Sequence, residues 1–320
     1  MIPRAFRGLV LATSVACIFL LYLFNTSTRI SISRHHDSPL PRLNLTDFHR
    51  VEEEEYQRNL QRREAMVQLY GGSPENVNPW PRRDLYTLWD FFLPSYNCPF
   101  QQRRLGVLGD GGKWFCGLAE LSTQRAPCVL YSFGINGESS FEAAVLSAAP
   151  QCEIWGYDFS VTSFGPEIER DPALAPRAHF FPYALGAYDE PDADPPMFTL
   201  QTLMRLNGHD FVDVLKVDVE GSEFGALASF VAHHANETET EHVLPIGQLQ
   251  LEVHARNEGA ATFSFPSFKR WWETLEWAGL RPFASEPNLV YSNHIRIEPS
   301  LAEYSFMNVR GRHMLTDHHY

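Results

Sequence analysis

The segment 213–224 carries closely spaced charges at the end of an apolar, β-branched run. Lys216, Asp218 and Glu220 alternate along it. Alternate residues of a strand point to one side, so these side chains share a face if the strand extends that far. Carboxylates at a strand end can move protons or hold a ligand. The simpler alternative is that the acids only cap the following helix, which Gly221 and Ser222 would begin, and face water.

A second acid and an imidazole end the expected strand 248–254. Glu252 and His254 share one side of it, beside the strand that carries Asp218. Such a pair suits proton transfer or metal binding. The alternative is an edge strand whose polar side chains are satisfied locally.

Asp110 and Lys113 belong to an Asp-Gly-Gly-Lys sequence between two short expected strands. This sequence is first of all typical of a tight turn. Its functional interpretation is a loop whose backbone closes on a ligand, with Lys113 available for an anionic group.

The elements that must position these residues begin with a glycine turn. The apolar run 128–133 leads into Gly134 and Gly137 and then into a helix to about residue 149. Free N–H groups at a helix start can hold a ligand, but the full three-glycine dinucleotide pattern is missing. A smaller nucleoside ligand fits better. Asp158, which ends the next strand, lies where nucleotide-binding α/β folds hold a ribose diol.

Strands alternate with helices along the chain, which indicates an α/β fold with a largely parallel sheet. Further strands are expected at 179–183 and 213–219, helices at 199–206, 223–233 and 267–278, and closing strands, partly antiparallel, at 281–283, 288–291 and 304–309.

The N-terminal region predicts the cellular compartment. Residues 8–24 are uncharged and mostly apolar, follow Arg4 and Arg7, and just reach the roughly 17–25 residues that a membrane span needs. Positive charge upstream favours a type II anchor after a short cytoplasmic tail, 1–7, and the short span favours the Golgi or endoplasmic reticulum. A cleaved signal peptide is the alternative. Residues 25–83 are interpreted as a stem with a charged helix, and residues 84–320 as a luminal domain.

Four cysteines follow the anchor, and a luminal domain would pair them. Cys128 and Cys152 begin two expected neighbouring strands, so we predict one disulfide there and another between Cys98 and Cys116. No cysteine spacing matches a zinc site, and no metal ligand is predicted. The net charge of −13 disfavours a nucleic-acid partner.

Taken together, the glycine turn, the strand that ends in an acid, the Ala184–Leu185 turn and the Lys-x-Asp-x-Glu-Gly segment at 216–221 resemble the FkbM-type S-adenosylmethionine-dependent methyltransferases. The Asp-Gly-Gly-Lys-Trp-x-Cys segment at 110–116 resembles their membrane-anchored, methyltransferase-like branch. This resemblance implies a Rossmann-like class I methyltransferase fold, with a mostly parallel seven-stranded sheet and helices on both faces. It implies S-adenosylmethionine as the cofactor, held by Phe133, Gly134, Asn136, Gly137, Glu138, Asp158, Phe159, Ala184 and Leu185.

The expected function is luminal O-methylation of a glycan, a protein or a small molecule. Asp218, Glu220 and His254 are the predicted bases, with Glu252 orienting the histidine and Lys216 tuning the acids. Asp110, Lys113 and Glu252 are the predicted substrate contacts. The alternatives are a type II glycosyltransferase, suggested by the anchor and by the acid pairs Asp192/Asp194 and Asp218/Glu220 and requiring manganese, and an inactive domain that binds a glycan or protein. Oligomeric state is not predicted.

Overall fold

The computed structural model describes residues 44–320 except 125, 236–242, 258–262, 296–297 and 318–320. The expected tail and anchor (1–24) and most of the expected stem before its helix lie outside the described residues. Within the described part of the chain, no helix combines the length and the apolar character that crossing a membrane requires.

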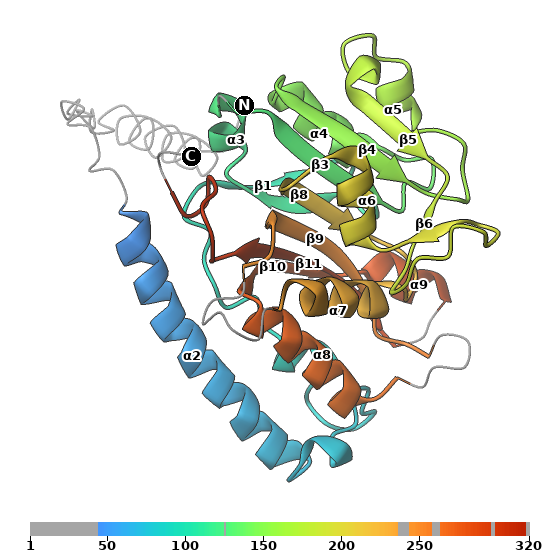
Figure 1. The fold of residues 1–320 in the computed structure, drawn as a ribbon. Coiled ribbons are helices and arrows are strands. Elements are labelled where there is room, and N and C mark those ends of the chain that lie inside the picture. The colour runs from blue at the N-terminus through green and yellow to red at the C-terminus, as the bar shows by residue number, and fades with distance from the viewer. Residues whose placement is uncertain (1–43, 125, 236–242, 258–262, 296–297, 318–320) are drawn as a thin grey trace, which may run out of the picture. The chain divides into compact units, whose positions relative to one another are not determined.

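A seven-stranded sheet forms the centre of the molecule, in the order β10-β11-β9-β8-β3-β4-β5 (Figure 1). Neighbours from β9 to β5 run parallel, whereas β11 is antiparallel to both β9 and β10. The mostly parallel α/β sheet predicted from the sequence is therefore confirmed. The seven strands are β3 (Cys128–Phe133), β4 (Cys152–Tyr157), β5 (Ala178–Phe181), β8 (Val212–Val217), β9 (Ile246–His254), β10 (Leu280–Pro287) and β11 (Leu301–Asn308).

Helices cover both faces of this sheet because its strands are apolar on both sides. Val214 of β8 packs in one core cluster with residues of α3, α4 and α5, while Leu215 and Val217 pack in another with α6, α7 and α8. The helices are α2 (Leu45–Tyr70), α3 (Leu118–Thr123), α4 (Ser140–Ala148), α5 (Pro166–Glu169), α6 (Leu200–Asn207), α7 (Glu223–His234), α8 (Phe265–Trp277) and α9 (Leu289–Ile295), with 3₁₀ turns η1 (Pro74–Asn76), η2 (Leu88–Phe91) and η3 (Ala175–Arg177).

Two small sheets flank the large one. One pairs β1 (Gln102–Leu105) with β2 (Lys113–Cys116) in antiparallel fashion, as expected for the Asp-Gly-Gly turn between them. The other pairs β6 (Ala184–Leu185) with β7 (Met197–Phe198). Residues 288–291 were expected to form a strand, but Asn288 is a connecting residue and 289–291 begin α9. The structure pairs Cys98 with Cys116 and Cys128 with Cys152, so both predicted disulfides are confirmed.

The helix α2 belongs to the folded domain. Arg63 is buried and forms a two-pronged ion pair with Glu276 of α8, at 2.6 and 2.9 Å, while Val67 packs into the main core. The compact unit spans Leu43–Tyr320. The boundary predicted at residue 84 therefore lies inside this unit, because one face of the charged helix α2 is buried.

Candidate active site

A cavity of about 300 Å³ opens at the carboxyl ends of β3, β4 and β8. The chain crosses from β3 outward to β4 and β5 and then returns to β8 and β9 on the other side. The cavity thus lies at the switch point where open α/β sheets bind ligands. It is lined by Asp110, Gly134, Asn136, Tyr157, Asp158, Phe159, Ser160, Tyr183, Ala184, Leu185, Asp218, Val219, Glu220, Ser222 and Glu252.

The turn after β3 forms the base of this cavity, and Gly134 is required there for two reasons. Its φ of +80° is a left-handed conformation, and a Cβ at this position would lie 1.8 Å from the backbone oxygen of Asp218. Lys216 Nζ donates to the Gly134 oxygen at 2.6 Å and lies 3.3 Å from Glu142 Oε1. Lys216 therefore stabilises the turn and does not line the cavity, contrary to the catalytic role expected for it.

The carboxylate of Asp158 ties the end of β4 to the same turn. One oxygen accepts the N–H groups of Ile135 and Asn136, each at 2.8 Å, and the other accepts the N–H and hydroxyl of Ser160. Burial opposes ionisation, but these hydrogen bonds outweigh it and lower the pKa of Asp158. The Asp158 side chain lines the cavity, and both of its oxygens already accept hydrogen bonds from the turn and from Ser160. Its contact with a ribose stays a prediction.

Three residues expected to hold the cofactor do not line the cavity. Phe133 is buried in the core, where its ring stacks on Tyr157 at 4.8 Å between centroids. Gly137 is exposed at the far side of the turn. Glu138 accepts from the Ser140 N–H and points toward the loop at Gly111. The other six, including Ala184 and Leu185, are lining residues, as their place at strand ends predicted.

The sequence suggested that Lys113 could hold an anionic substrate, but in the structure its ammonium group is already paired with two acids. Its side chain is 1% exposed, bonds to Glu303 of β11, and lies 3.4 Å from Asp218 Oδ2. Burial alone would lower the pKa of Lys113, but the carboxylates of Glu303 and Asp218 outweigh it and raise that pKa. Lys113 is thus a buried counter-ion beneath the cavity.

Asp218 and Glu220 do not share a strand face, because β8 ends at Val217 and Glu220 takes a left-handed φ of +54°. The Asp218 side chain is 20% exposed and that of Glu220 is 70% exposed. Burial opposes ionisation of Asp218, but Lys113 and Lys216 outweigh it and lower its pKa. Asp218 therefore favours its anionic form in a mostly buried position, whereas Glu220 lies at the mouth, 2.7 Å from Arg256.

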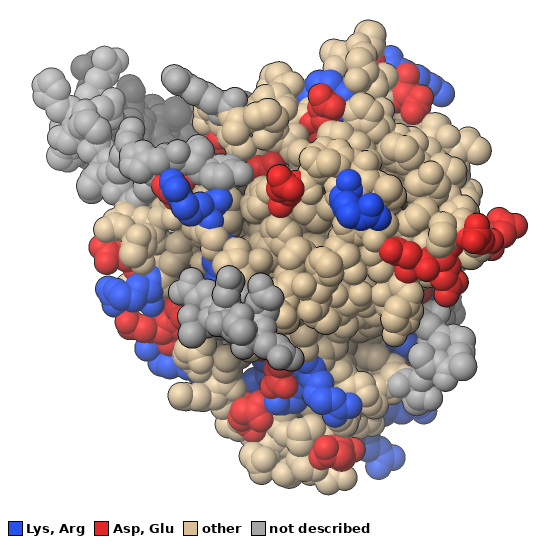
Figure 2. Space-filling view, in the orientation of Figure 1, with Lys and Arg blue, Asp and Glu red and all other residues tan. Residues whose placement is uncertain are grey.

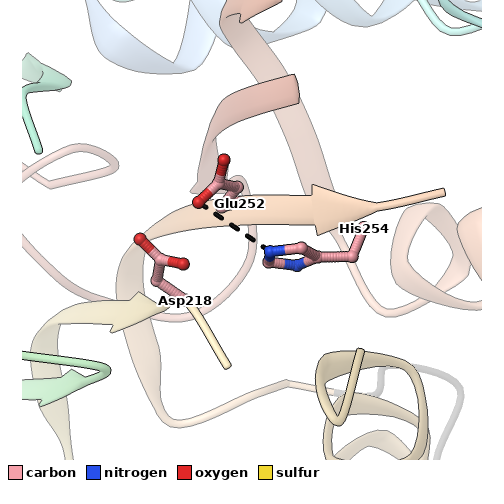
Figure 3. Close-up of side chains that lie close together, drawn as sticks. All are labelled: Asp218, Glu252 and His254. Carbon is pink, nitrogen blue, oxygen red and sulfur yellow. Dashed lines mark ion pairs between the residues drawn. The ribbon is translucent and has the colours of Figure 1, made fainter. Parts of the chain in front are cut away.

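His254 is fully buried beside these acids and differs from its expected role in two respects (Figure 3). Its Nδ1 lies 3.2 Å from Glu223 Oε1, so Glu223 orients the ring; Glu252 is 4.0 Å away from Nε2. Burial would lower the pKa of His254, but the neighbouring Glu220 and Glu223 outweigh it and raise the pKa to about 11. An imidazolium cannot accept a proton at neutral pH, so His254 does not fit the role of base.

Glu252 projects from the end of β9 toward His254 and Asp218 (Figure 3). Its Oε1 accepts from Asn288 at 2.8 Å. Burial and the nearby charges of Asp218 and Glu303 raise the pKa of Glu252, so this carboxyl favours its protonated form. Glu252 can therefore donate a hydrogen bond into the cavity as well as accept one.

Two acids of this cluster were missed from the sequence. Glu223 begins α7 and Glu303 lies in the otherwise apolar β11. An acid within an apolar strand was a usable signal for Glu303. Its position opposite Glu252 depends on the antiparallel register of β11 with β9, which the sequence does not reveal.

The lining side chains define what this cavity can accept. Among the described residues that line it, none is lysine or arginine, while five are acids and three are aromatic. This set fits a cationic ligand with an aromatic ring and a ribose, and does not fit a pyrophosphate. On the molecular face drawn in Figure 2, basic side chains are dispersed among acidic ones without forming a continuous basic patch.

Comparisons with known proteins agree with this site. Residues 45–299 match the family model described as "Methyltransferase domain". No curated protein matches the sequence. Solved structures with a similar arrangement include a fibrillarin/Nop5p complex (11% identity, TM-score 0.34, covering 60% of this chain and 79% of that chain) and Methanococcus jannaschii fibrillarin (13% identity, TM-score 0.33, covering 65% and 83%). These likenesses are too low to add an argument. The family match extends from α2 to the start of β11 and takes in the whole cavity, and on that ground the chain belongs to this family of methyltransferase domains.

Proposed function

We propose that this methyltransferase domain uses S-adenosylmethionine to methylate a hydroxyl group of a glycan, a protein or a small molecule in the secretory pathway, as an FkbM-type enzyme. The observation that carries the proposal is the acidic, aromatic cavity at the switch point of the sheet, which holds no basic lining residue among those described. A sulfonium-bearing nucleoside is complementary to such a cavity.

The residues present fit this cofactor. The Gly134–Asn136 turn would receive its amino-acid part, Asp158 its ribose, and Tyr183, Ala184 and Leu185 its adenine. When bound, S-adenosylmethionine supplies a methyl group activated by the positive sulfur. The chain's own contribution is to position the acceptor and to exclude other nucleophiles.

A hydroxyl acceptor must also lose a proton. Asp158, Asp218 and Glu220 are lining carboxylates with lowered pKa values. Asp158 is already bonded to the turn, so Asp218 and Glu220 are the ones that can accept a hydrogen bond from the acceptor. Asp218 is the better placed because it is buried beside the turn, while Glu220 is at the mouth. Glu252, which favours its protonated form, would donate to the acceptor and fix its orientation.

The proposed compartment is the lumen of the Golgi or endoplasmic reticulum, with residues 8–24 as a type II anchor. The two disulfides support it, because such bonds persist in oxidising compartments and are rare in the cytosol. The exposed Asn44 lies in a sequon at the start of α2, where a luminal glycan could be attached.

Calorimetric titration of the full chain with S-adenosylmethionine, in EDTA, tests the proposal. We expect saturable binding that weakens in Asp158→Asn and persists in Asp192→Asn, a charge-matched change in an exposed loop. The rival glycosyltransferase reading predicts heat only with a nucleotide sugar and manganese. Absence of binding to S-adenosylmethionine would refute our proposal. Comparing glycans and proteins from cells with and without the gene, by mass, would then identify the acceptor that gains one methyl group.

A further inference from the structure

We infer that Asp218, Glu252 and His254 form a binding site for one divalent transition-metal ion. One ligand atom from each residue lies within 4.8 Å of the other two (Figure 3). The sequence left Glu252 and His254 open to either proton transfer or metal binding, because their approach to Asp218 on another strand end arises only in the folded sheet.

The histidine gives the first argument. His254 Nδ1 lies 3.2 Å from the fully buried carboxylate of Glu223, which also accepts the His254 backbone N–H at 2.9 Å. A carboxylate on one ring nitrogen is the usual way in which a protein orients a histidine that binds metal through the other. That other nitrogen, Nε2, is buried and makes no hydrogen bond with any described residue, although Glu220 Oε2 lies 3.3 Å away.

The distances give the second argument. Bonds of about 2.0–2.2 Å place two ligand atoms of one ion roughly 3–4.4 Å apart. Glu252 Oε2 is 4.0 Å from His254 Nε2, within that range, while Glu252 Oε1 is held by Asn288. All three ligand atoms lie within 4.8 Å of one another, so at most a small rotation of an acidic side chain is needed to bring the whole group into that range. The ion would take the place of the proton on Nε2.

Charge gives the third argument. Asp218 and Glu303 share one lysine, Lys113, and Glu252 lies opposite Glu303 on the neighbouring strand. Neighbouring carboxylates cannot all ionise without a counter-charge between them. A divalent ion on the side of the cluster away from Lys113 would supply that charge and would displace the proton of Glu252 on binding.

A second group of acids, Asp110, Glu252 and Glu303, also has close ligand atoms. It contains no histidine, Asp110 is exposed, and Glu303 is already bonded to Lys113. The first group is therefore the better site. One imidazole with two carboxylates suits Mn²⁺ or Zn²⁺, whereas an all-oxygen set would suit Mg²⁺ or Ca²⁺.

The ion would have a task in the cavity, and this part of the inference rests on the proposed function. Asp218 and Glu252 both line the cavity, so an open coordination position can face the acceptor. A hydroxyl bound to a divalent ion loses its proton more readily. The proton would pass to Glu220 or to water, and the oxygen would keep the electron pair with which it attacks the methyl carbon. As the oxygen–carbon bond forms, the carbon–sulfur bond of S-adenosylmethionine would break, its electron pair would stay on the sulfur, and the neutral thioether S-adenosylhomocysteine would leave.

Binding is tested without any activity measurement. Purified full-length protein is titrated with Mn²⁺, the free ion being followed by its electron paramagnetic resonance signal, and native Zn²⁺ and Mn²⁺ are counted by elemental mass spectrometry. We expect one site per chain. His254→Gln should weaken Mn²⁺ binding by at least about 100-fold, and Glu223→Gln by about 10–100-fold, because Glu223 only orients the ring. The control Asp192→Asn/Asp194→Asn, which removes two exposed acids, should bind Mn²⁺ as the wild type does.

Three outcomes would overturn the inference: no saturable Mn²⁺ or Zn²⁺ binding, binding unchanged in His254→Gln, or binding lost in Asp110→Asn but kept in His254→Gln. Circular dichroism shows whether each variant is folded, and Glu252→Gln replaces His254→Gln if the latter is not. The same samples are titrated with S-adenosylmethionine in EDTA. If S-adenosylmethionine binds in EDTA but the Mn²⁺ and Zn²⁺ titrations show no site, this inference is refuted and the proposed function stays intact.

Discussion

Replacing Lys113 with methionine removes a cation that contacts both Asp218 and Glu303. The lysine side chain is 1% exposed, so methionine fills its volume without exposing a charge. Breaking a buried ion pair from one side costs about 3–5 kcal/mol, because the remaining carboxylate is left unpaired in a poorly solvated site. We expect Lys113→Met to lower the free energy of unfolding by that amount near neutral pH, a large fraction of the total stability of a domain.

The loss should depend on pH in a definite direction. The Asp218 carboxyl has a lowered native pKa, so in the wild type its contribution is present above about pH 3.9 and is lost as the pH falls through the native pKa. In Lys113→Met the unpaired acids instead have raised native pKa values. They therefore take up protons in the native state as the pH falls, and stability is regained. The difference between variant and wild type should thus shrink from about pH 7.5 to about pH 5.5.

Urea unfolding followed by tryptophan fluorescence, at both pH values, measures this difference. Lys269→Met is the control, because Lys269 forms its ion pairs with the exposed Glu64 and Glu273 and should contribute less than about 1 kcal/mol. The double variant Lys113→Met/Glu303→Met should recover part of the loss, since it removes a stranded charge. The reasoning is refuted if Lys113→Met costs no more than Lys269→Met near neutral pH, or if its cost grows on acidification.

Three further predictions concern the turn, a buried histidine and α2. Gly134→Ala should cost roughly 1–3 kcal/mol and weaken S-adenosylmethionine binding, because its Cβ would meet the Asp218 oxygen; calorimetry and urea unfolding measure both. Burial lowers the pKa of His313 to about 4, so as the pH falls from about 6.5 to 4 the unfolded chain is protonated first. Across that pH range the free energy of unfolding of the wild type should fall by up to about 3 kcal/mol more than that of His313→Phe, as measured by urea unfolding. Arg63→Met should cost about 3–5 kcal/mol in the same assay, since it strands the buried Glu276.

Each of these has a matched control. Gly208→Ala places a Cβ in open space at a similar φ, so it should lose about 1–2 kcal/mol without affecting the cofactor. Replacing the partly exposed His179 should leave the acid-dependent loss in place. Arg50→Met breaks an exposed pair and should cost less than about 1 kcal/mol. The reasoning fails for Gly134→Ala if it binds S-adenosylmethionine as tightly as Gly208→Ala does. It fails for His313→Phe if its acid-dependent loss of stability equals that of the His179 variant, and for Arg63→Met if its loss of stability equals that of Arg50→Met.

The order of elements could be predicted because it depends on local patterns. Apolar runs ending at Gly134, at Asp158 and at Asp218 mark three strand ends, and in a parallel sheet these ends meet on one edge. That is why the cavity lies where the sequence placed it. The disulfide between Cys128 and Cys152 followed from the same logic, since neighbouring parallel strands begin side by side.

The roles of the charged residues could not be predicted in this way. Whether Lys113 contacts a ligand or lies buried depends on β2 packing against β11, which brings Glu303 to it from 190 residues away. The protonation of His254 likewise depends on Glu223, which belongs to a different element. A pKa is set by burial and by every charge within a few ångströms, and the sequence specifies neither.

The sequence by itself therefore determined the α/β class, the strand ends that form the cavity, and the candidate acids Asp218 and Glu252. Only the tertiary structure decided that α2 is part of the domain and that Lys216 stabilises the turn. It also decided that Glu223, rather than Glu252, orients the ring of His254. The physical reason is range: periodicity and turn chemistry act over a few residues, whereas burial and electrostatic pairing act between residues that only folding brings together.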